Sequence, residues 1–312
     1  MTLRIALVGS IAKMGKQLLS EFIKTPCEIR EFPCNLDDIE VLAGYPVTPG
    51  TVAKTPRLRL VHSIGAGTDA IATWALPAGV QVSNTYHHEH AIAEYILLTM
   101  LAFERDLIAQ DRRFRQRNWE GSCVTGPPMA RELRGLVLGL VGFGHIGRET
   151  ARLAEAFGVA VRALRSNHTR ADLEELLRSS DHVALACPLT EQTRGMIGEP
   201  ELRLMKPAAC LINVARAEVV QEEALYQALR GRTIRGAALD VWYRYPKAAE
   251  PNPLPCNFPF HELDNVIMTP HSSCWTDRCF SQRFADIAAN IDRLARGEAI
   301  ENVVFTSKGP QS

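Results

Sequence analysis

Short apolar runs alternate with helix-spaced apolar residues through the second half of the chain. Each run is bounded by glycine, proline or polar residues, which is typical of a strand buried on both faces. Strands that alternate with helices indicate an α/β fold with a parallel, doubly wound sheet. The predicted strands lie in LVLGLVGFG (136–144), VAVRAL (159–164), HVALAC (182–187), ACLINVA (209–215), IRGAALDV (234–241) and NVIMTP (265–270).

The N-terminal third predicts a second α/β unit. LRIALVG (3–9) has the pattern of a buried strand, and AKMGKQLLSEFI (12–23) has helical spacing. RLRLVHSIGAGTDAI (57–71) predicts a strand, a glycine turn and a helix start, and VQVSNT (80–85) predicts another strand. We therefore expect two α/β domains, one in the middle of the chain and one at its N-terminus.

Two longer helices complete the predicted pattern. The first follows residue 85, with expected inward positions at Ile92, Ile96, Thr99, Phe103 and Leu107. The second ends at Gly297 and has inward positions at Phe284, Ile287, Ile291 and Leu294. We assign residues 1–96 and 280–312 to one domain and residues 97–279 to the other. A cleft between two such domains is the natural ligand site.

The composition argues against nucleic acid and membranes as binding partners. The chain of 312 residues has 35 Lys and Arg against 35 Asp and Glu, so it lacks the basic excess that favours nucleic acid or an acidic membrane. The basic stretch DRRFRQRNW (111–119) is interpreted as the solvated end of a long helix. No stretch reaches the ~18 apolar residues of a membrane span, and the N-terminal apolar run is too short for a signal peptide. We expect a cytoplasmic protein with neither nucleic-acid nor membrane partners.

A glycine-rich turn follows the predicted strand at 136–141. Gly142, Gly144 and Gly147 have the G-x-G-x-x-G spacing between a strand and a helix. Glycines at these positions allow a tight turn, close approach of the backbone to a pyrophosphate, and close helix–strand packing. In this strand–helix context the motif predicts a dinucleotide-binding Rossmann-type domain.

The next strand ends without the acidic residue that commonly holds the ribose of NAD. About 20 residues after such a turn an NAD enzyme usually has Asp or Glu, but this strand ends in Arg165, Ser166 and Asn167. An arginine can pair with the 2′-phosphate of NADP. We predict NADP preference through Arg165 and Ser166; the alternative is that Arg165 is a surface residue and the cofactor is NAD.

Two charged or titratable residues follow later strands. Arg216 follows LINVA and His271 follows IMTP, and in a parallel sheet such strand ends are where ligands bind. A guanidinium suits a carboxylate or a polarised carbonyl, and a histidine can exchange a proton near neutral pH. Beside a dinucleotide turn, the two residues favour hydride-transfer chemistry.

Several motifs together resemble the D-2-hydroxyacid dehydrogenase family. They occur in family order over almost the whole chain: GAGTD (65–69), NTYHHEHAIAE (84–94), VGFGHIG (141–147), CPLTEQTRG (187–195), LINVARAEVV (211–220), GAALDVW (236–242) and TPH (269–271). The resemblance implies a Rossmann-type dinucleotide domain at 97–279, and a flavodoxin-like substrate domain at 1–96 and 280–312. It also implies a homodimer.

The resemblance also implies roles for individual residues. Ala66 and Gly67 would offer backbone N–H groups to the substrate carboxylate. Arg216 would bind that carboxylate and polarise the keto oxygen, and His271 would exchange a proton with it. The remaining implied positions are His145 and Ile146 at the pyrophosphate, Pro188 and Thr193 at the adenosine, and Val214 and Asp240 at the nicotinamide.

The acidic partner of the histidine is missing from its usual place. The family places a glutamate five residues after the aspartate of the LDV run, just before a proline, and here that position holds Tyr245 followed by Pro246. We interpret Tyr245 as the residue in the acid's position. In the alternative, an insertion brings Glu250, which precedes Pro251, to the same place.

These observations leave three functional hypotheses. The first is an NADP-preferring oxidoreductase that acts on a small 2-keto or 2-hydroxy acid. The second is oxidation of formate, phosphite or a related anion, because formate dehydrogenases, which look like distant relatives, carry an amide in the position of Tyr245. The third is a non-catalytic NAD(P)-sensing protein, because this fold also serves regulation.

Cysteine and histidine spacing does not predict a metal site. None of the eight cysteines forms a CxxC pair, so we expect scattered reduced thiols. HHEH (87–90) lacks the helical H-E-x-x-H spacing of a zinc site. The resemblance instead suggests that Tyr86, His87 or His88 shapes the substrate pocket.

Overall fold

The computed structural model describes residues 2–247 and 249–309. The chain divides into two compact units, which are described separately: unit 1 comprises Met1–His87 and Thr276–Ser312, and unit 2 comprises His88–Trp275. Unit 1 overlaps the predicted substrate domain and unit 2 the predicted dinucleotide domain, but the first boundary lies nine residues before the predicted one (87 against 96) and the second four residues before it (275 against 279). The roles of the two units remain predictions.

Unit 1 is built on a sheet with the strand order β12-β5-β4-β3-β1-β2. Strands β1 to β5 are parallel in the flavodoxin-like order 2-1-3-4-5, and β12 pairs antiparallel at one edge. The sequence reasoning identified β1, β4 and β5 and missed the other three. The strands are β1 (Leu3–Val8), β2 (Cys27–Glu31), β3 (Val41–Gly44), β4 (Leu60–His62), β5 (Gln81–Ser83) and β12 (Val303–Thr306).

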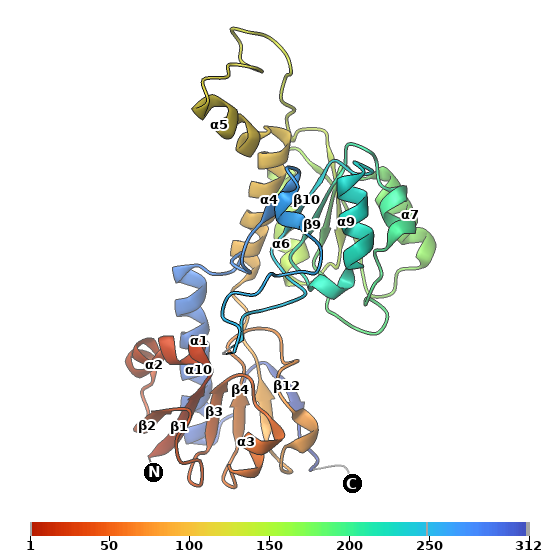
Figure 1. Cartoon of the computed structure of the whole chain (residues 1–312). Coiled ribbons are helices and arrows are strands. Elements are labelled where there is room, and N and C mark those ends of the chain that lie inside the picture. Colours follow the sequence, from red (N-terminus) through yellow and green to blue (C-terminus); the bar gives the residue numbers. More distant parts are fainter. Residues whose placement is uncertain (1, 248, 310–312) are drawn as a thin grey trace. The chain divides into compact units, whose positions relative to one another are not determined.

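The C-terminal helix α10 (Asp277–Arg296) covers this sheet beside α2 (Figure 1). Its predicted inward residues pack with β1, β3 and β4, and it ends at Gly297 as predicted, where φ is 71°. Phe284 lies so close to α2 that a Cβ on Gly15 would stand 1.9 Å from its ring. The other helices of unit 1 are α1 (Ser10–Met14), α2 (Lys16–Phe22) and α3 (Pro49–Ala53).

A buried histidine links β4 to α10. His62 has no exposed surface, its Nδ1 lies 2.8 Å from the Ser63 carbonyl oxygen, and its Nε2 lies 3.0 Å from Asn290 Nδ2. Since the Asn290 amide donates to Nε2, Nδ1 carries the hydrogen of a neutral ring. Desolvation by burial lowers the pKa of His62 to about 4.

We expect His62 to make the fold sensitive to acid. The unfolded chain binds a proton at this histidine below about pH 6.5 and the folded chain only below about pH 4, so the free energy of unfolding falls by roughly 3 kcal/mol as the pH drops across that window. Urea unfolding at pH 7 and pH 4.5 measures this loss. His62→Gln, which cannot titrate, is expected to lose less stability than the wild type. Equal losses in both proteins would contradict the prediction.

Unit 2 is built on a parallel sheet with the strand order β11-β10-β9-β8-β6-β7. Every strand predicted from the apolar runs at 136–270 is present. They are β6 (Val137–Val141), β7 (Ala160–Leu164), β8 (His182–Leu185), β9 (Cys210–Asn213), β10 (Gly236–Leu239) and β11 (Val266–Met268). The helices that connect them are α6 (His145–Ala156), α7 (Arg170–Ser179), α8 (Glu199–Leu204) and α9 (Glu222–Arg230). The prediction of a doubly wound α/β fold is confirmed.

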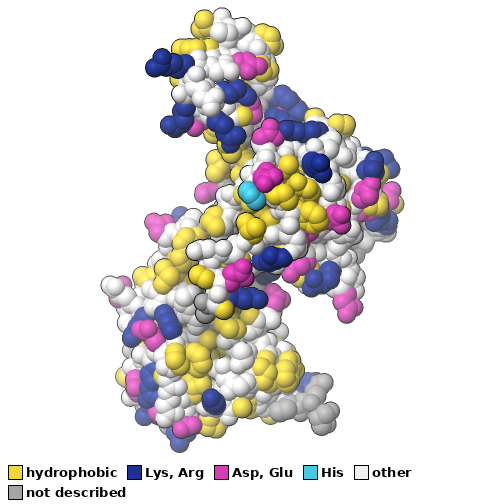
Figure 2. All heavy atoms as spheres, viewed as in Figure 1, with side chains coloured by type: hydrophobic (Ala, Val, Ile, Leu, Met, Phe, Trp, Pro, Cys, Tyr) yellow, Lys and Arg dark blue, Asp and Glu magenta, His cyan; other side chains and the backbone are white. Residues whose placement is uncertain are grey.

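The long helix predicted after residue 85 is two helices. α4 (Glu89–Glu104) is followed by Asp106 in a left-handed conformation (φ 49°), and α5 (Leu107–Arg115) then leaves the sheet (Figure 1). The predicted inward position of Leu107 is wrong: the residue is 54% exposed, because the left-handed residue redirects the chain. The segment containing α5 carries both basic and apolar side chains on its surface (Figure 2). The predicted inward positions that are buried are Ile92, Ile96 and Thr99.

Two chain-wide expectations are tested by the structure. All eight cysteines are free thiols, as the scattered spacing predicted. Over residues 2–247 and 249–309, no helix combines the length and apolar character needed to cross a bilayer.

Candidate functional site

The parallel register brings the predicted site residues of unit 2 to one edge of the sheet. Val141, Leu185, Asn213, Leu239 and Met268 pair across neighbouring strands and form one row. The segments that follow this row begin at Gly142, Ala186, Val214, Asp240 and Thr269. The glycine turn, the arginine and the histidine, far apart in sequence, therefore follow the carboxyl ends of strands in a single sheet.

The glycine turn after β6 has room only for glycine at two of its three positions. Gly142 has φ 107°, and a Cβ there would stand 2.7 Å from the Ala186 backbone; a Cβ on Gly147 would stand 2.3 Å from the Gly142 carbonyl oxygen. A Cβ on Gly144 would meet no described atom within 4 Å, so the backbone is open at this point. α6 starts next with no side-chain cap and no acidic residue in its first turn. The predicted contacts His145 and Ile146 lie in that turn, whose N–H groups suit a pyrophosphate.

The residues that directly follow β7 are polar, and none of Arg165, Ser166 and Asn167 is acidic. Arg165 and Ser166 follow the strand and are exposed. The Arg165 guanidinium lies 5.5 Å from the ring centroid of Phe143, a residue of the glycine turn, within the range of a cation–π contact. Arg165, Asn167 and His168 line a surface pocket of about 400 Å³, together with the acidic residues Asp172 and Glu175 of α7.

The segment after β8 carries the predicted adenosine contacts. The Thr193 hydroxyl donates to the Pro188 carbonyl oxygen over 2.7 Å and accepts from the Thr190 amide over 2.8 Å. These bonds close a compact loop. Val214, predicted at the nicotinamide, is 6% exposed and directly follows β9.

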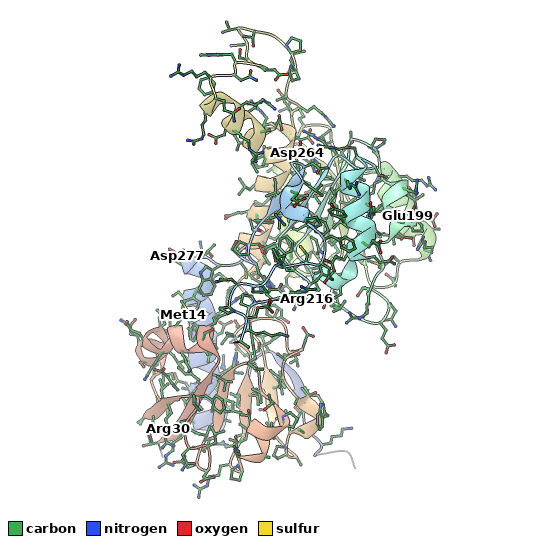
Figure 3. The ribbon with its side chains drawn as sticks, in the orientation of Figure 1. Met14, Arg30, Glu199, Arg216, Asp264 and Asp277 are labelled. Atoms are coloured by element: carbon green, nitrogen blue, oxygen red, sulfur yellow. The ribbon has the colours of Figure 1, made fainter. Side chains whose placement is uncertain are left out.

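Arg216 is presented by a bend after β9. The Asn213 side chain accepts from the Ala215 amide (3.1 Å) and donates to the Arg216 carbonyl oxygen (3.1 Å), which fixes the backbone on both sides of the bend. Arg216 Nη1 donates to the Ala215 carbonyl oxygen over 2.8 Å. Figure 3 labels the half-buried side chain at the lower edge of the unit 2 sheet.

Asp240 holds the loop that carries His271. The fully buried carboxylate accepts from the Thr269 hydroxyl (2.6 Å) and the Ser272 amide (2.8 Å) through one oxygen, and from the Ser273 amide (3.0 Å) through the other. Tyr95 donates to the Thr269 hydroxyl over 2.7 Å. Sequence reasoning placed Asp240 at the nicotinamide and did not identify its part in positioning this loop.

Tyr245 contacts His271 directly. Its hydroxyl lies 2.9 Å from His271 Nδ1 and accepts from the Trp242 amide over 3.2 Å, and the two rings are tilted by 52°. Desolvation raises the pKa of Tyr245, so the hydroxyl is neutral through the ordinary pH range. The alternative residue, Glu250, instead exchanges backbone bonds with Lys247. The tyrosine in the acid's sequence position is therefore a hydrogen-bond partner of His271.

In unit 1, two side chains hold the GAG turn (65–67) by donating hydrogen bonds to its carbonyl oxygens. The Asn84 side chain donates to the Ala66 carbonyl oxygen and the Ser63 hydroxyl donates to the Gly67 carbonyl oxygen, each over 2.8 Å. The amides of Ala66 and Gly67 have no acceptor among the described residues. The turn can therefore donate to an anion, as the resemblance implies.

Side chains of the histidine-rich segment and of Thr85 before it form hydrogen bonds with acidic residues. His87 and the Thr85 hydroxyl both bond Asp286, over 2.9 and 2.6 Å, and His90 bonds Glu149 over 2.8 Å. In the parts of the chain that the structure describes, no group of three His, Cys, Asp or Glu side chains is arranged to hold a metal.

The sheet and its glycine turn define a dinucleotide-binding protein of the doubly wound α/β class. Residues 97–273 match the family model "D-isomer specific 2-hydroxyacid dehydrogenase, NAD binding domain". Glyoxylate reductase of Thermococcus gammatolerans is 36% identical over an alignment of 328 positions that covers 96% of this chain and 95% of the relative. The chain belongs to the D-isomer specific 2-hydroxyacid dehydrogenase family, whose members are NAD(P)-dependent oxidoreductases.

Solved structures agree with this assignment. D-lactate dehydrogenase of Aquifex aeolicus, in complex with NAD and lactic acid, superposes with a TM-score of 0.80 at 26% identity, covering 99% of this chain and 100% of that chain. An acyclic imino acid reductase in complex with NADPH and D-Arg gives 0.76 at 25% identity, covering 97% and 100%. Both nucleotides therefore occur among the structural neighbours.

Proposed function

We propose that the protein is an NADP-preferring reductase of small 2-keto acids, and that the reaction can also run as oxidation of the 2-hydroxy acid. The observation that carries the proposal is the aligned row of strand ends in unit 2, from which the glycine turn, Arg216 and His271 all follow. The glyoxylate reductase relative supports a small 2-keto acid as substrate.

The proposed roles follow from the chemistry of each group. NADPH, when bound, would supply the hydride for the keto carbon. The Ala66 and Gly67 amides bind the substrate carboxylate, and the Arg216 fork binds the same carboxylate and polarises the keto oxygen. His271 supplies the proton that this oxygen takes up. Tyr245 orients the imidazole through Nδ1, and Asp240 orients the loop that carries it.

The proposed cofactor contacts lie on the segments that follow β6, β7, β8, β9 and β10. The Gly142, Gly144 and Gly147 turn with the amides of His145 and Ile146 suits the pyrophosphate, and Pro188 and Thr193 border the adenosine. Val214 and Asp240 would border the nicotinamide. NADP preference rests on Arg165 and Ser166, where a carboxylate would repel the 2′-phosphate.

Replacing Arg165 by glutamine is expected to raise the KM for NADPH about 10-fold or more, because a charge-assisted hydrogen bond to the phosphate contributes about 1.5–3 kcal/mol. The KM for NADH is expected to change little. Arg178→Gln removes the same charge from the exposed face of α7 and is the matched control. If Arg165→Gln prefers NADPH over NADH as strongly as the wild type does, Arg165 does not bind the 2′-phosphate.

A homodimer is proposed as the working assembly. The family resemblance implies it, and the segment around α5 supports it, because large apolar side chains remain exposed there. These are Leu107, Ile108, Phe114, Trp119 and Met129. The sedimentation velocity of the purified chain tests the proposal.

The direct test follows NADPH and NADH absorbance near pH 6.5 with glyoxylate, hydroxypyruvate, pyruvate, 2-oxobutyrate and phenylpyruvate. Turnover that favours NADPH supports the substrate class and the cofactor assignment together. Turnover that favours NADH keeps the reductase and rejects the preference. Cofactor binding without turnover of any of these five acids rejects a reductase of 2-keto acids with neutral side chains and favours formate or phosphite oxidation, or an NAD(P)-sensing role, unless a keto acid with an acidic side chain turns over.

A further inference from the structure

An arginine on α10 lies beside the GAG turn of unit 1. Arg283 is half-buried, and its Nε donates to the Tyr86 carbonyl oxygen over 3.1 Å. Its Nη1 lies 4.0 Å from the point where a Cβ on Gly65 would stand. The side chain is therefore anchored at Nε, while Nη1 of its guanidinium lies beside the turn at Gly65.

No carboxylate neutralises this guanidinium among the described residues. The nearest acidic residue along the same helix, Asp286, accepts from the Thr85 hydroxyl (2.6 Å) and bonds the His87 ring (2.9 Å), and forms no ion pair with Arg283. A half-buried charge is normally paired, because desolvation disfavours an isolated one. The absence of an internal partner leaves Arg283 suited to an anion from outside the chain.

The turn beside Arg283 already offers donors to one anion. The carbonyl groups of Ala66 and Gly67 are occupied by Asn84 and Ser63, whereas the amides of the same two residues have no acceptor in the described chain. Unit 1 therefore brings two kinds of anion donor together: backbone amides, which suit a single carboxylate, and a planar guanidinium fork, which suits a second carboxylate or a phosphate.

We propose that Arg283 binds a second anionic group on the substrate, so that the enzyme prefers 2-keto acids with an acidic side chain over those with a neutral one. The inference rests on the proposed function, in which the turn amides bind the carboxylate next to the keto group. A side-chain carboxylate and a side-chain phosphate share the required chemistry.

The test compares steady-state reduction of glyoxylate, 2-oxobutyrate, 2-oxoglutarate and 3-phosphohydroxypyruvate by the wild type, Arg283→Gln and Arg283→Lys. We expect Arg283→Gln to lower kcat/KM for at least one diacid about 10- to 100-fold, which corresponds to the loss of one charge-assisted hydrogen bond. Glyoxylate and 2-oxobutyrate are expected to change less than about 3-fold, since neither reaches the fork. Arg283→Lys keeps the charge and should retain part of the preference. Arg278→Gln, an exposed arginine of the same helix, is the matched control.

The outcomes separate this inference from the proposed function. Wild-type turnover of glyoxylate with no selective loss in Arg283→Gln overturns the inference and leaves the proposed function intact. Equal losses for all four substrates overturn it too, because Arg283 would then serve the shared carboxylate or the fold.

If no keto acid turns over, the proposed function fails. Thermal stabilisation by 2-oxoglutarate over 2-oxobutyrate, lost in Arg283→Gln, then supports the anion site, and equal stabilisation rejects it. Selective loss with 2-oxoglutarate identifies a carboxylate ligand, and selective loss with the phosphorylated acid identifies a phosphate.

Discussion

Replacing Arg216 by glutamine is expected to lower kcat/KM for glyoxylate by about 10²–10³-fold, the usual cost of removing one donor that stabilises developing charge on a carbonyl oxygen. The side chain follows β9 on a bend that Asn213 fixes from both sides, so it is presented in a defined position. Both kcat and KM should change, because the proposed contacts are with the carboxylate and with the keto oxygen. Arg216→Lys should recover only part of the loss, since a lysine cannot bond two atoms in a planar fork.

The control for Arg216 is an arginine whose bonds are confined to a helix surface. Arg203 pairs with Glu199 one turn away on α8, both exposed, and such pairs contribute little. Arg203→Gln should retain activity. NADPH affinity, measured by fluorescence titration, should be the same in the wild type and Arg216→Gln. A loss of activity that is matched by a loss of cofactor affinity would mean that Arg216 supports the cofactor site instead of the substrate.

The strands of unit 2 could be predicted because each lies in a short apolar run, and most of them are buried, although β7 and β11 are partly exposed. β9 and β10 have every residue buried, and so does the central strand β8. Two of the three strands of unit 1 that escaped prediction lack such a signal: β2 is partly exposed along its length and β12 is fully exposed. The third, β3, is buried at every position and was missed although it carries the signal. β12 is specified by its pairing with β5, a contact between residues more than 200 positions apart.

The sequence predicted where the site residues lie, but it did not predict which residues hydrogen-bond the loops that carry them. A strand end predicts that a residue lies at the edge of the sheet, which was sufficient for Arg216 and His271. Their supports depend on contacts across the fold: Tyr95 on α4 reaches Thr269, and Asn84 after β5 reaches the GAG turn. The helix break at Asp106 was missed because a left-handed aspartate has no clear sequence signal, and the apolar spacing continues through Leu107.

Replacing Tyr245 by glutamate is expected to move the alkaline limb of the pH–rate profile for keto-acid reduction upward by about 1–3 pH units, because a neighbouring carboxylate raises the pKa of a histidine by that amount. Reduction requires a protonated His271, so the rate falls as the pH rises through the pKa of the imidazole. The wild-type hydroxyl is neutral, since desolvation raises the pKa of Tyr245, and it therefore supplies no negative charge. The wild type should lose activity at lower pH than Tyr245→Glu.

The hydrogen bonds of Tyr245 also select the form of the neutral imidazole. The Trp242 amide donates to the hydroxyl oxygen, so the hydrogen of the hydroxyl is available to His271 Nδ1. A neutral ring that accepts at Nδ1 carries its own hydrogen on Nε2. This tautomer can donate a hydrogen bond to a keto oxygen, but full proton transfer requires the imidazolium or a proton drawn from Tyr245.

Tyr245→Phe separates orientation from charge. Loss of the hydroxyl is expected to lower kcat about 10-fold, the cost of leaving Nδ1 without its partner, and to leave the alkaline limb near its wild-type position. Tyr243→Phe is the matched control, because that hydroxyl bonds the Val220 carbonyl oxygen over 2.7 Å and not the histidine. A limb that stays in place in Tyr245→Glu would show that residue 245 does not set the protonation of His271 during turnover. An upward shift in Tyr245→Glu, together with a slower but unshifted Tyr245→Phe, would assign the wild-type tyrosine to positioning and explain how the reaction proceeds without the usual acid.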